Sequence, residues 1–86
     1  MLITFSKNAW ADYTSWLNED KSMLKKINKL IKDISRTPYE GKGKPEPLKY
    51  KLAGLWSRRM DREHRLVYQV KGEEIIIYSC RYHYDL

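Results

Sequence analysis

The sequence contains a single cysteine, Cys80, in 86 residues. One cysteine cannot form an internal disulfide, so the chain lacks the cross-links that hold many small secreted domains together. The apolar run 2–5 is broken at once by Ser6 and Lys7, and no apolar stretch approaches the length of a membrane span. These absences predict a cytoplasmic protein with a reduced thiol and no membrane association.

Residue types that bind metals or nucleotides are also scarce. The chain has two histidines and one cysteine, without the spacing of a zinc site. It contains no G-x-G-x-x-G motif, no P-loop and no nucleophile elbow. We therefore expect no metal and no cofactor, so any catalysis must use ordinary side chains.

Positive charge, by contrast, is abundant. Seventeen lysines and arginines against eleven acids give a net charge of +6. This surplus favours a polyanion such as nucleic acid, or an acidic partner protein, although a soluble basic domain without such a partner has the same composition. With 42% hydrophobic residues and three tryptophans, residues 1–86 are expected to fold as one small domain.

The first half of the chain predicts a short strand and two helices. Residues 2–5 form the strand, and Ser6 is suited to cap a helix that carries Trp10, Tyr13 and Leu17 on one face. The segment 18–20 ends this helix, and Asp20 is suited to cap the next one. That second helix has one apolar stripe: Met23, Ile27, Leu30, Ile31 and Ile34.

The segment 37–47 predicts a long loop. Thr37-Pro38 ends the second helix, because the residue before a proline is pushed out of the helical region. The segment holds all three prolines and two of the four glycines. A loop of this length in so small a domain is typically functional or disordered.

The second half of the chain alternates in the manner of β-strands. Four runs separated by turns, at 48–52, 55–60, 64–70 and 74–84, predict an antiparallel meander. With the first strand and the helices, this pattern gives an α+β domain. Two N-terminal helices pack on a twisted antiparallel sheet of four to five strands.

Alternation along these strands predicts which side chains share a face of the sheet. Even positions form a core face, with Arg58 and His64 as exceptions: Leu48, Tyr50, Leu52, Trp56, Met60, Leu66, Tyr68, Val70, Ile76, Tyr78, Cys80 and Tyr82. Odd positions form an open cationic face: Lys49, Lys51, Ser57, Arg59, Arg65, Gln69, Ser79, Arg81 and His83. Adjacent cations repel, so a bound phosphate backbone is a simple candidate to offset that cost. Apolar odd positions predict a partner-binding patch on the same face: Leu55, Val67, Ile75 and Ile77.

Three side chains are candidates for chemistry. Glu46 lies between two prolines that restrict its backbone, although an ordinary loop acid fits equally well. His83 has a side chain suited to proton transfer near neutrality; the alternative is an exposed histidine near a frayed end. Arg65 offers a fork of donors matched to phosphate, or is a solvated strand residue. A base, an acid and a cation are the parts needed to cleave RNA by attack of a ribose 2′-OH on the adjacent phosphorus.

Four segments resemble the YoeB branch of the RelE-type toxins. They are E-G-K-G-K-P-E-P-L-K at 40–49, G-L-W-S-R-R at 54–59, E-H-R-L-V-Y at 63–68 and C-R-Y-H-Y at 80–84. The run K-I-N-K-L-I-K-D in the second helix also matches, so the resemblance covers nearly the whole chain in order. It implies a RelE-like microbial RNase fold and a metal-independent endoribonuclease that inhibits translation by cleaving mRNA in the ribosomal A site.

The resemblance also implies roles and partners. By position, Glu46 matches the general base, Arg65 the phosphate-stabilising arginine and His83 the general acid. Further positions match residues that contact substrate or lie near the scissile bond: Lys49, Arg59 and Tyr84. The implied partners are a YefM-like antitoxin, the ribosome with its mRNA, operator DNA through the antitoxin complex, and a second copy in a homodimer. Residues 85–86 extend past the tyrosine with which relatives often end, which leaves the role of Tyr84 open.

Two other functions fit the same sequence. A non-catalytic basic module that grips RNA or an acidic antitoxin segment needs the cationic face, but neither Glu46 nor His83. The toxin-like half of a repressor complex that has lost its nuclease activity also fits, although all the matched catalytic positions are present.

Overall fold

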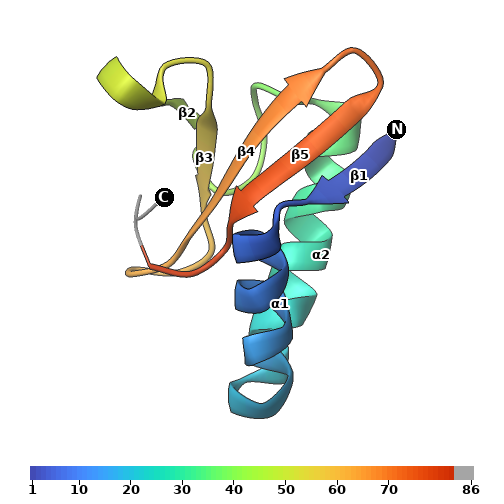
Figure 1. The fold of residues 1–86 in the computed structure, drawn as a ribbon, viewed down its shortest axis with the longest axis vertical. Coiled ribbons are helices and arrows are strands. Elements are labelled where there is room, and N and C mark those ends of the chain that lie inside the picture. The colour runs from blue at the N-terminus through green and yellow to red at the C-terminus, as the bar shows by residue number, and fades with distance from the viewer. Residues whose placement is uncertain (83–86) are drawn as a thin grey trace.

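The structure is a computed structural model, and it describes residues 1–82. The elements follow in the order β1 (Leu2–Phe5), α1 (Lys7–Glu19), α2 (Lys21–Arg36), β2 (Glu46–Pro47), the 3₁₀ turn η1 (Tyr50–Leu52), β3 (Trp56–Arg59), β4 (Arg65–Lys71) and β5 (Glu74–Ser79). The strands form one sheet in the order β1-β5-β4-β3-β2, with the two helices packed on it (Figure 1). The predicted α+β architecture is confirmed.

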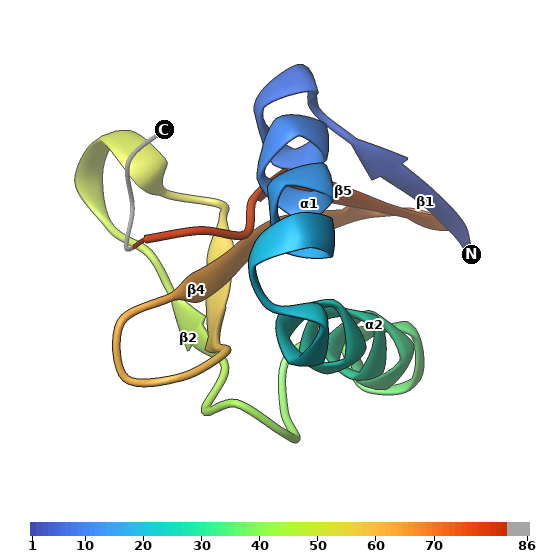
Figure 2. The ribbon, with the colours of Figure 1, turned by 90° about the horizontal axis from the view of Figure 1, so that it is seen from below.

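The sheet is mixed rather than wholly antiparallel. β1 runs parallel to β5, with Ile3 opposite Ile75, whereas the other pairings are antiparallel. Short turns connect β3 to β4 and β4 to β5, which requires antiparallel pairing. Both helices and three strands separate β1 from β5 in the chain, so β1 can pair with β5 in either direction. The N–H of Ser6 secures the pair by donating to the carbonyl oxygen of Ile77 at 2.9 Å. β1 and η1 lie at opposite edges of the sheet (Figure 2).

Both helices begin at the predicted caps. The hydroxyl oxygen of Ser6 accepts the N–H of Ala9 at 3.0 Å, and the carboxylate of Asp20 accepts the N–H of Ser22 at 3.0 Å. Each cap satisfies a donor that the first helical turn leaves without a partner. α2 ends at Arg36, and its C-cap residue Thr37 lies directly before the proline. These boundary predictions are confirmed.

The apolar stripe of α2 forms the centre of the hydrophobic core. Its members are at most 6% exposed: Met23, Ile27, Leu30, Ile31 and Ile34. They belong to the same cluster as Leu66 of β4 and Ile77 of β5. Burial of this stripe against the sheet is the main apolar contribution of the helix to stability.

The helix α1 buries a different face from the one that carries Trp10 and Leu17. Those two side chains are 55% and 51% exposed, while Ala9 and Trp16 are buried. The indole N–H of Trp16 donates to the carbonyl oxygen of Cys80 at 3.0 Å, which fixes the side that faces inward. Local spacing alone cannot reveal such a long-range bond.

The pairing of β4 with β5 reverses the predicted alternation on β5. Val70 lies opposite Ile75 and Tyr68 opposite Ile77, so even positions of β4 oppose odd positions of β5. Directly opposed residues point to the same face, so the odd positions of β5 turn to the core together with Tyr68. Ile75 and Ile77 are therefore fully buried in the core, Val67 is buried as well, and the predicted partner patch that included all three is wrong.

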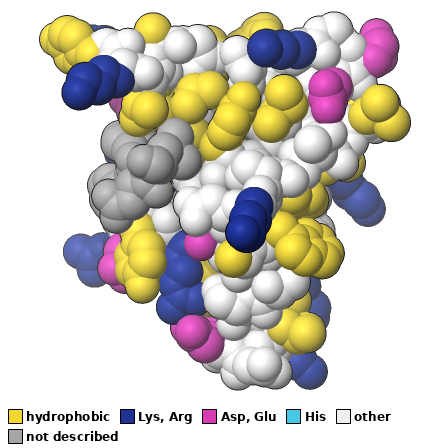
Figure 3. All heavy atoms as spheres, in the orientation of Figure 1, with side chains coloured by type: hydrophobic (Ala, Val, Ile, Leu, Met, Phe, Trp, Pro, Cys, Tyr) yellow, Lys and Arg dark blue, Asp and Glu magenta, His cyan; other side chains and the backbone are white. Residues whose placement is uncertain are grey.

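The other face of β5 is apolar in part. Ile76 and Tyr78, predicted for the core, are only half-buried, and the hydroxyl of Tyr78 donates to the side-chain oxygen of Gln69 at 3.1 Å. In the orientation of Figure 1, hydrophobic side chains gather across the upper part of the surface, and lysines and arginines are scattered among and around them (Figure 3). The predicted open face of the sheet is therefore less cationic than expected, and its apolar side chains are not the ones predicted.

The run 48–52 is not a strand. β2 comprises only Glu46–Pro47, and the chain then forms η1, in which the N–H of Leu52 donates to the carbonyl oxygen of Lys49 at 3.0 Å. Tyr50 has a φ of 57°, a left-handed conformation that no strand contains. Its side chain is 92% exposed instead of lying in the core. Both predictions for this segment are wrong.

The single cysteine is free and fully buried. Burial, aided by the charge of Asp12, raises the pKa of the Cys80 thiol to about 12. The thiol is therefore protonated near neutrality and is a poor nucleophile. Within residues 1–82, neither helix is long and apolar enough to cross a membrane.

Candidate functional site

A hollow of about 460 Å³ opens beside the short strand β2. Its walls come from the end of the long loop, from β2, from β3 and from β4: Lys44, Pro45, Glu46, Pro47, Ser57, Arg59 and Arg65. Three residues that the sequence predicted for the site thus line one space: Glu46, Arg59 and Arg65. We call this space the acid–arginine hollow.

The register of the sheet explains this convergence. Glu46 lies opposite Ser57 on β3, and Arg59, two residues further along β3, lies opposite Arg65 on β4. Residues two apart on a strand, and residues directly opposed on neighbouring strands, point to the same face. The carboxylate and both guanidinium groups therefore share one face. Since the two arginines repel each other, an anion placed between them lowers the energy of the site.

Arg65 is a buried residue and not a solvated strand residue. It is 8% exposed, and its Nη1 donates to the carbonyl oxygens of Asp61 and His64 at 2.9 and 3.1 Å. His64 is itself fixed, because its Nδ1 accepts the N–H of Tyr82 at 2.8 Å and its ring packs edge-on against Trp16. A guanidinium held this way is screened less by water and salt than a flexible surface cation.

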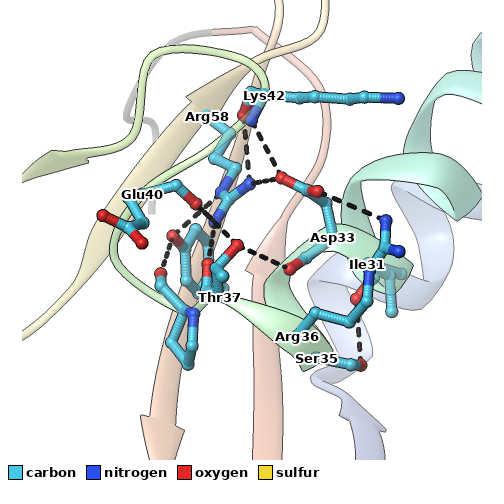
Figure 4. A network of polar contacts seen from close by, with 10 residues as sticks. Ile31, Asp33, Ser35, Arg36, Thr37, Glu40, Lys42 and Arg58 are labelled. Carbon is cyan, nitrogen blue, oxygen red and sulfur yellow. Dashed lines mark hydrogen bonds and ion pairs between the residues drawn. The ribbon is translucent and has the colours of Figure 1, made fainter.

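Arg58, the neighbour of Arg59, points to the opposite face and is fully buried (Figure 4). Its guanidinium donates to three carbonyl oxygens of the loop: Thr37 at 2.6 Å, Glu40 at 2.9 Å and Lys42 at 3.1 Å. It also donates to the carboxylate of Asp33 on α2 at 2.5 Å. The loop that leads to Glu46 is therefore ordered around one buried cation.

Asp33 and Tyr68 complete this arrangement, which we call the loop anchor (Asp33, Arg58 and Tyr68). The carboxylate of Asp33 accepts the backbone N–H of Lys42 at 2.8 Å. This bond and, next, the bond from Arg58 hold the pKa of Asp33 below its ordinary value. The hydroxyl of Tyr68 accepts from Arg58 Nε at 3.1 Å and donates to the carbonyl oxygen of Pro38 at 2.7 Å.

Sequence reasoning missed the loop anchor. Its signals were an acid, Asp33, beside the buried stripe of α2, and an arginine, Arg58, at a core position of the predicted sheet. A buried acid and a buried base need each other, because an unpaired buried charge is costly. Pairing Asp33 with Arg58 would have placed α2 against β3.

Gly43 joins the loop directly to β3. The N–H of Arg59 donates to the carbonyl oxygen of Gly43 at 2.7 Å. The glycine has a φ of 81°, and a Cβ at this position would lie 3.0 Å from the carbonyl oxygen of Arg59. Only glycine allows this close approach without strain. The loop is thus held to β3 by this backbone bond as well as by Arg58, shortly before Glu46.

Two further hollows adjoin the acid–arginine hollow. One, of about 550 Å³, shares Glu46 and Pro47 with the acid–arginine hollow. It is lined by Glu46, Pro47, Leu48, Lys49, Tyr50 and Leu52. The sequence-predicted substrate residue Lys49 lies here. The other, of about 150 Å³, shares Arg59, and four of its six lining residues are lysines or arginines: Lys26, Lys29, Leu30, Lys42, Arg59 and Met60. Positive charge therefore extends from the site toward α2.

The remaining predicted site residues fall elsewhere. Arg81 does not join the cationic face, because its guanidinium donates to Ser15 at 2.7 Å and to Glu19 at 2.6 Å and lies over the ring of Trp16. The prediction that Arg81 shares the face of Arg59 is wrong, since the chain has left β5 before this residue. His83 and Tyr84 lie outside the described residues.

The described part of the site has a clear chemical character. One exposed carboxylate faces two arginines, so the hollow can accept an anionic group and remove a proton next to it. Within residues 1–82, no three histidine, cysteine, aspartate or glutamate residues lie together as a metal site. Fold and site define a small α+β domain with an acid–arginine site for an anionic ligand.

Known proteins place this domain in a family. The model of the family described as "YoeB-like toxin of bacterial type II toxin-antitoxin system" matches residues 5–84. Toxin YoeB of Escherichia coli (strain K12) is 57% identical, over 98% of this chain and 100% of that protein. The chain belongs to this family of YoeB-like toxins.

Solved structures agree with this assignment. The YoeB dimer from Staphylococcus aureus has a TM-score of 0.92 and 53% identity, over 98% of each chain. The toxin in a heterotetrameric YoeB–YefM toxin–antitoxin complex from Staphylococcus aureus has a TM-score of 0.90 and 53% identity, over 98% of this chain and 99% of that chain. The resemblance found in the sequence is thereby confirmed.

Proposed function

We propose that this toxin is an endoribonuclease that cleaves mRNA in the A site of the ribosome and so inhibits translation. The observation that carries the proposal is the acid–arginine hollow, in which Glu46 shares one face of the sheet with Arg59 and Arg65. A carboxylate beside two cations, of which Arg65 is held in place by hydrogen bonds, matches the needs of a phosphodiester whose neighbouring hydroxyl must lose a proton.

The proposed reaction is an internal transfer. Glu46 takes the proton of a ribose 2′-OH, and that oxygen attacks the adjacent phosphorus. The bond to the 5′ oxygen breaks, leaving a cyclic phosphate, and His83 supplies the proton that the 5′ oxygen needs. Arg65 stabilises the negative charge that develops on the phosphate oxygens, with Arg59 on the opposite side. Lys49 and Tyr84 are proposed to contact the substrate on either side of the bond.

The fixed position of Arg65 supports its proposed role. Two backbone carbonyl oxygens hold its Nη1, so the cation is oriented before the substrate arrives. Preorganised charge stabilises a transition state without reorganisation at the moment of reaction. The loop anchor gives the same advantage to Glu46, because it fixes the segment that leads to the base.

The proposal includes partners. A YefM-like antitoxin is proposed to bind and inhibit the toxin, because the solved complex from Staphylococcus aureus contains YoeB together with YefM. The resulting complex is proposed to bind operator DNA. A homodimer is proposed from the solved YoeB dimer. The net charge of +6 suits both an acidic antitoxin segment and RNA.

Mapping of mRNA 5′ ends tests this function. A defined mRNA is incubated with the protein, with and without ribosomes stalled at one codon. We expect new ends only within the A-site codon and only when ribosomes are present. Intact mRNA on programmed ribosomes would contradict the proposed function, and equal cutting of free mRNA would contradict the dependence on the ribosome.

A further inference from the structure

The most exposed large hydrophobic side chain among residues 1–82 is that of Tyr50, at 92%. It also has an unfavourable backbone: a φ of 57° is rare for a bulky side chain. Neither burial nor local conformation therefore explains a tyrosine here. Strain of this kind is found mainly at functional sites, where the surrounding structure enforces it.

The turn that holds Tyr50 is well defined. The N–H of Leu52 donates to the carbonyl oxygen of Lys49 at 3.0 Å, and the N–H of Ala53 donates to that of Tyr50 at 3.1 Å. The N–H of Leu48 also pairs with the carbonyl oxygen of Leu55 at 2.8 Å across the base of the turn. These hydrogen bonds hold the backbone that carries the ring of Tyr50.

Tyr50 lines the hollow of about 550 Å³ that shares Glu46 and Pro47 with the acid–arginine hollow. Most of the remaining lining is apolar, from Leu48 and Leu52, and Lys49 supplies a positive charge. An aromatic ring, aliphatic walls and a flanking cation are the combination on which single-stranded nucleic acids stack their bases.

The proposed reaction fixes which base could reach this hollow. Glu46 must meet the 2′-OH of the nucleotide on the 5′ side of the broken bond, while the phosphate lies toward Arg59 and Arg65. Since Glu46 separates the two hollows, the base of that same nucleotide lies on the side of Tyr50. The phosphate and the base would then occupy neighbouring spaces.

We propose that the hollow lined by Tyr50 is a nucleobase subsite, in which the ring of Tyr50 stacks on the base immediately 5′ of the cleaved bond. Stacking on an aromatic ring accepts any base, because every base has a π-face. The subsite therefore positions the nucleotide that supplies the 2′-OH without selecting its sequence. This inference rests on the proposed function and extends it.

The test compares cleavage of programmed ribosomes by the wild type, Tyr50→Ala and Tyr50→Phe. We expect Tyr50→Ala to lower kcat/KM by about 5- to 150-fold, the effect of losing one base–aromatic stack. Tyr50→Phe keeps the ring and should cleave like the wild type. On an mRNA with an abasic nucleotide immediately 5′ of the cut, the wild type and Tyr50→Ala should cleave at equal rates.

Trp10→Ala is the matched control, because Trp10 is another exposed aromatic residue and lies on α1, outside both hollows. Its cleavage rate should be that of the wild type. The inference is wrong if Tyr50→Ala cleaves normally, or if its defect persists on the abasic mRNA, which would place the contact elsewhere. If the wild type itself does not cleave, the proposed function fails, and this inference fails with it.

Discussion

Replacing Glu46 with alanine is expected to slow the cleavage of ribosome-bound mRNA by about 10²- to 10⁴-fold. The reason is that Glu46 is the carboxylate in the acid–arginine hollow that is proposed to take the proton of the 2′-OH. Its side chain is exposed on a two-residue strand, so thermal unfolding should change little. The cleavage rate is measured on programmed ribosomes at saturating protein, alongside the unfolding temperature.

Glu40→Ala is the matched control for this prediction. Glu40 is an exposed acid of the same loop, but its side chain lines neither the acid–arginine hollow nor the hollow of Tyr50. Its loss should leave cleavage unchanged. If Glu46→Ala kept full activity and full growth inhibition, the catalytic proposal would be wrong. A basic module that acts by binding alone would then be favoured, with Arg59 and Arg65 as its essential residues.

Replacing Arg58 with methionine is expected to destabilise the fold by about 3 kcal/mol or more. Methionine fills similar space but removes five hydrogen bonds, to Tyr68, to Asp33 and to three loop carbonyl oxygens. Asp33 would remain buried without its cation, which is the costly half of breaking such a pair. Urea denaturation followed by tryptophan fluorescence measures the loss.

Arg59→Met is the control for Arg58→Met, because it makes the same chemical change one residue along the same strand. Arg59 is exposed and lines the acid–arginine hollow, so its loss should change the free energy of unfolding by less than about 0.5 kcal/mol. It should nevertheless lower the cleavage rate. Equal urea midpoints for Arg58→Met and the wild type would show that the loop anchor contributes nothing to stability.

Local features of the fold were predictable from the sequence because their causes are local. Ser6 and Asp20 cap helices through bonds to residues two or three positions away, and the stripe of α2 follows helical spacing. The parallel pairing of β1 with β5 and the inward face of α1 depend on contacts between distant segments. Pattern reasoning has no access to those contacts.

The candidate site shows the same difference between features with local causes and features that depend on distant contacts. Arg59 and Arg65 were placed on one face correctly, because β3 and the start of β4 alternate regularly. On β5 the alternation fails, because Val70 lies opposite Ile75 and turns the odd positions of β5 to the core. Arg81 is misplaced because β5 ends before it. Alternation also predicted Tyr50 in the core, because it cannot signal a left-handed residue. Whether an arginine is buried, as Arg58 is, depends on a partner from another segment.

The central claim is that Glu46, with Arg59 and Arg65 in the same hollow, acts on a ribose 2′-OH beside a phosphodiester. The most direct measurement is the cleavage of an mRNA that carries a single 2′-deoxyribose at the cut site, on programmed ribosomes. The substitution removes the attacking oxygen and leaves the phosphate and the base sequence of the mRNA unchanged. We predict that this mRNA stays intact at that position while an all-ribose mRNA is cut. Cleavage of both at the same rate would contradict the account.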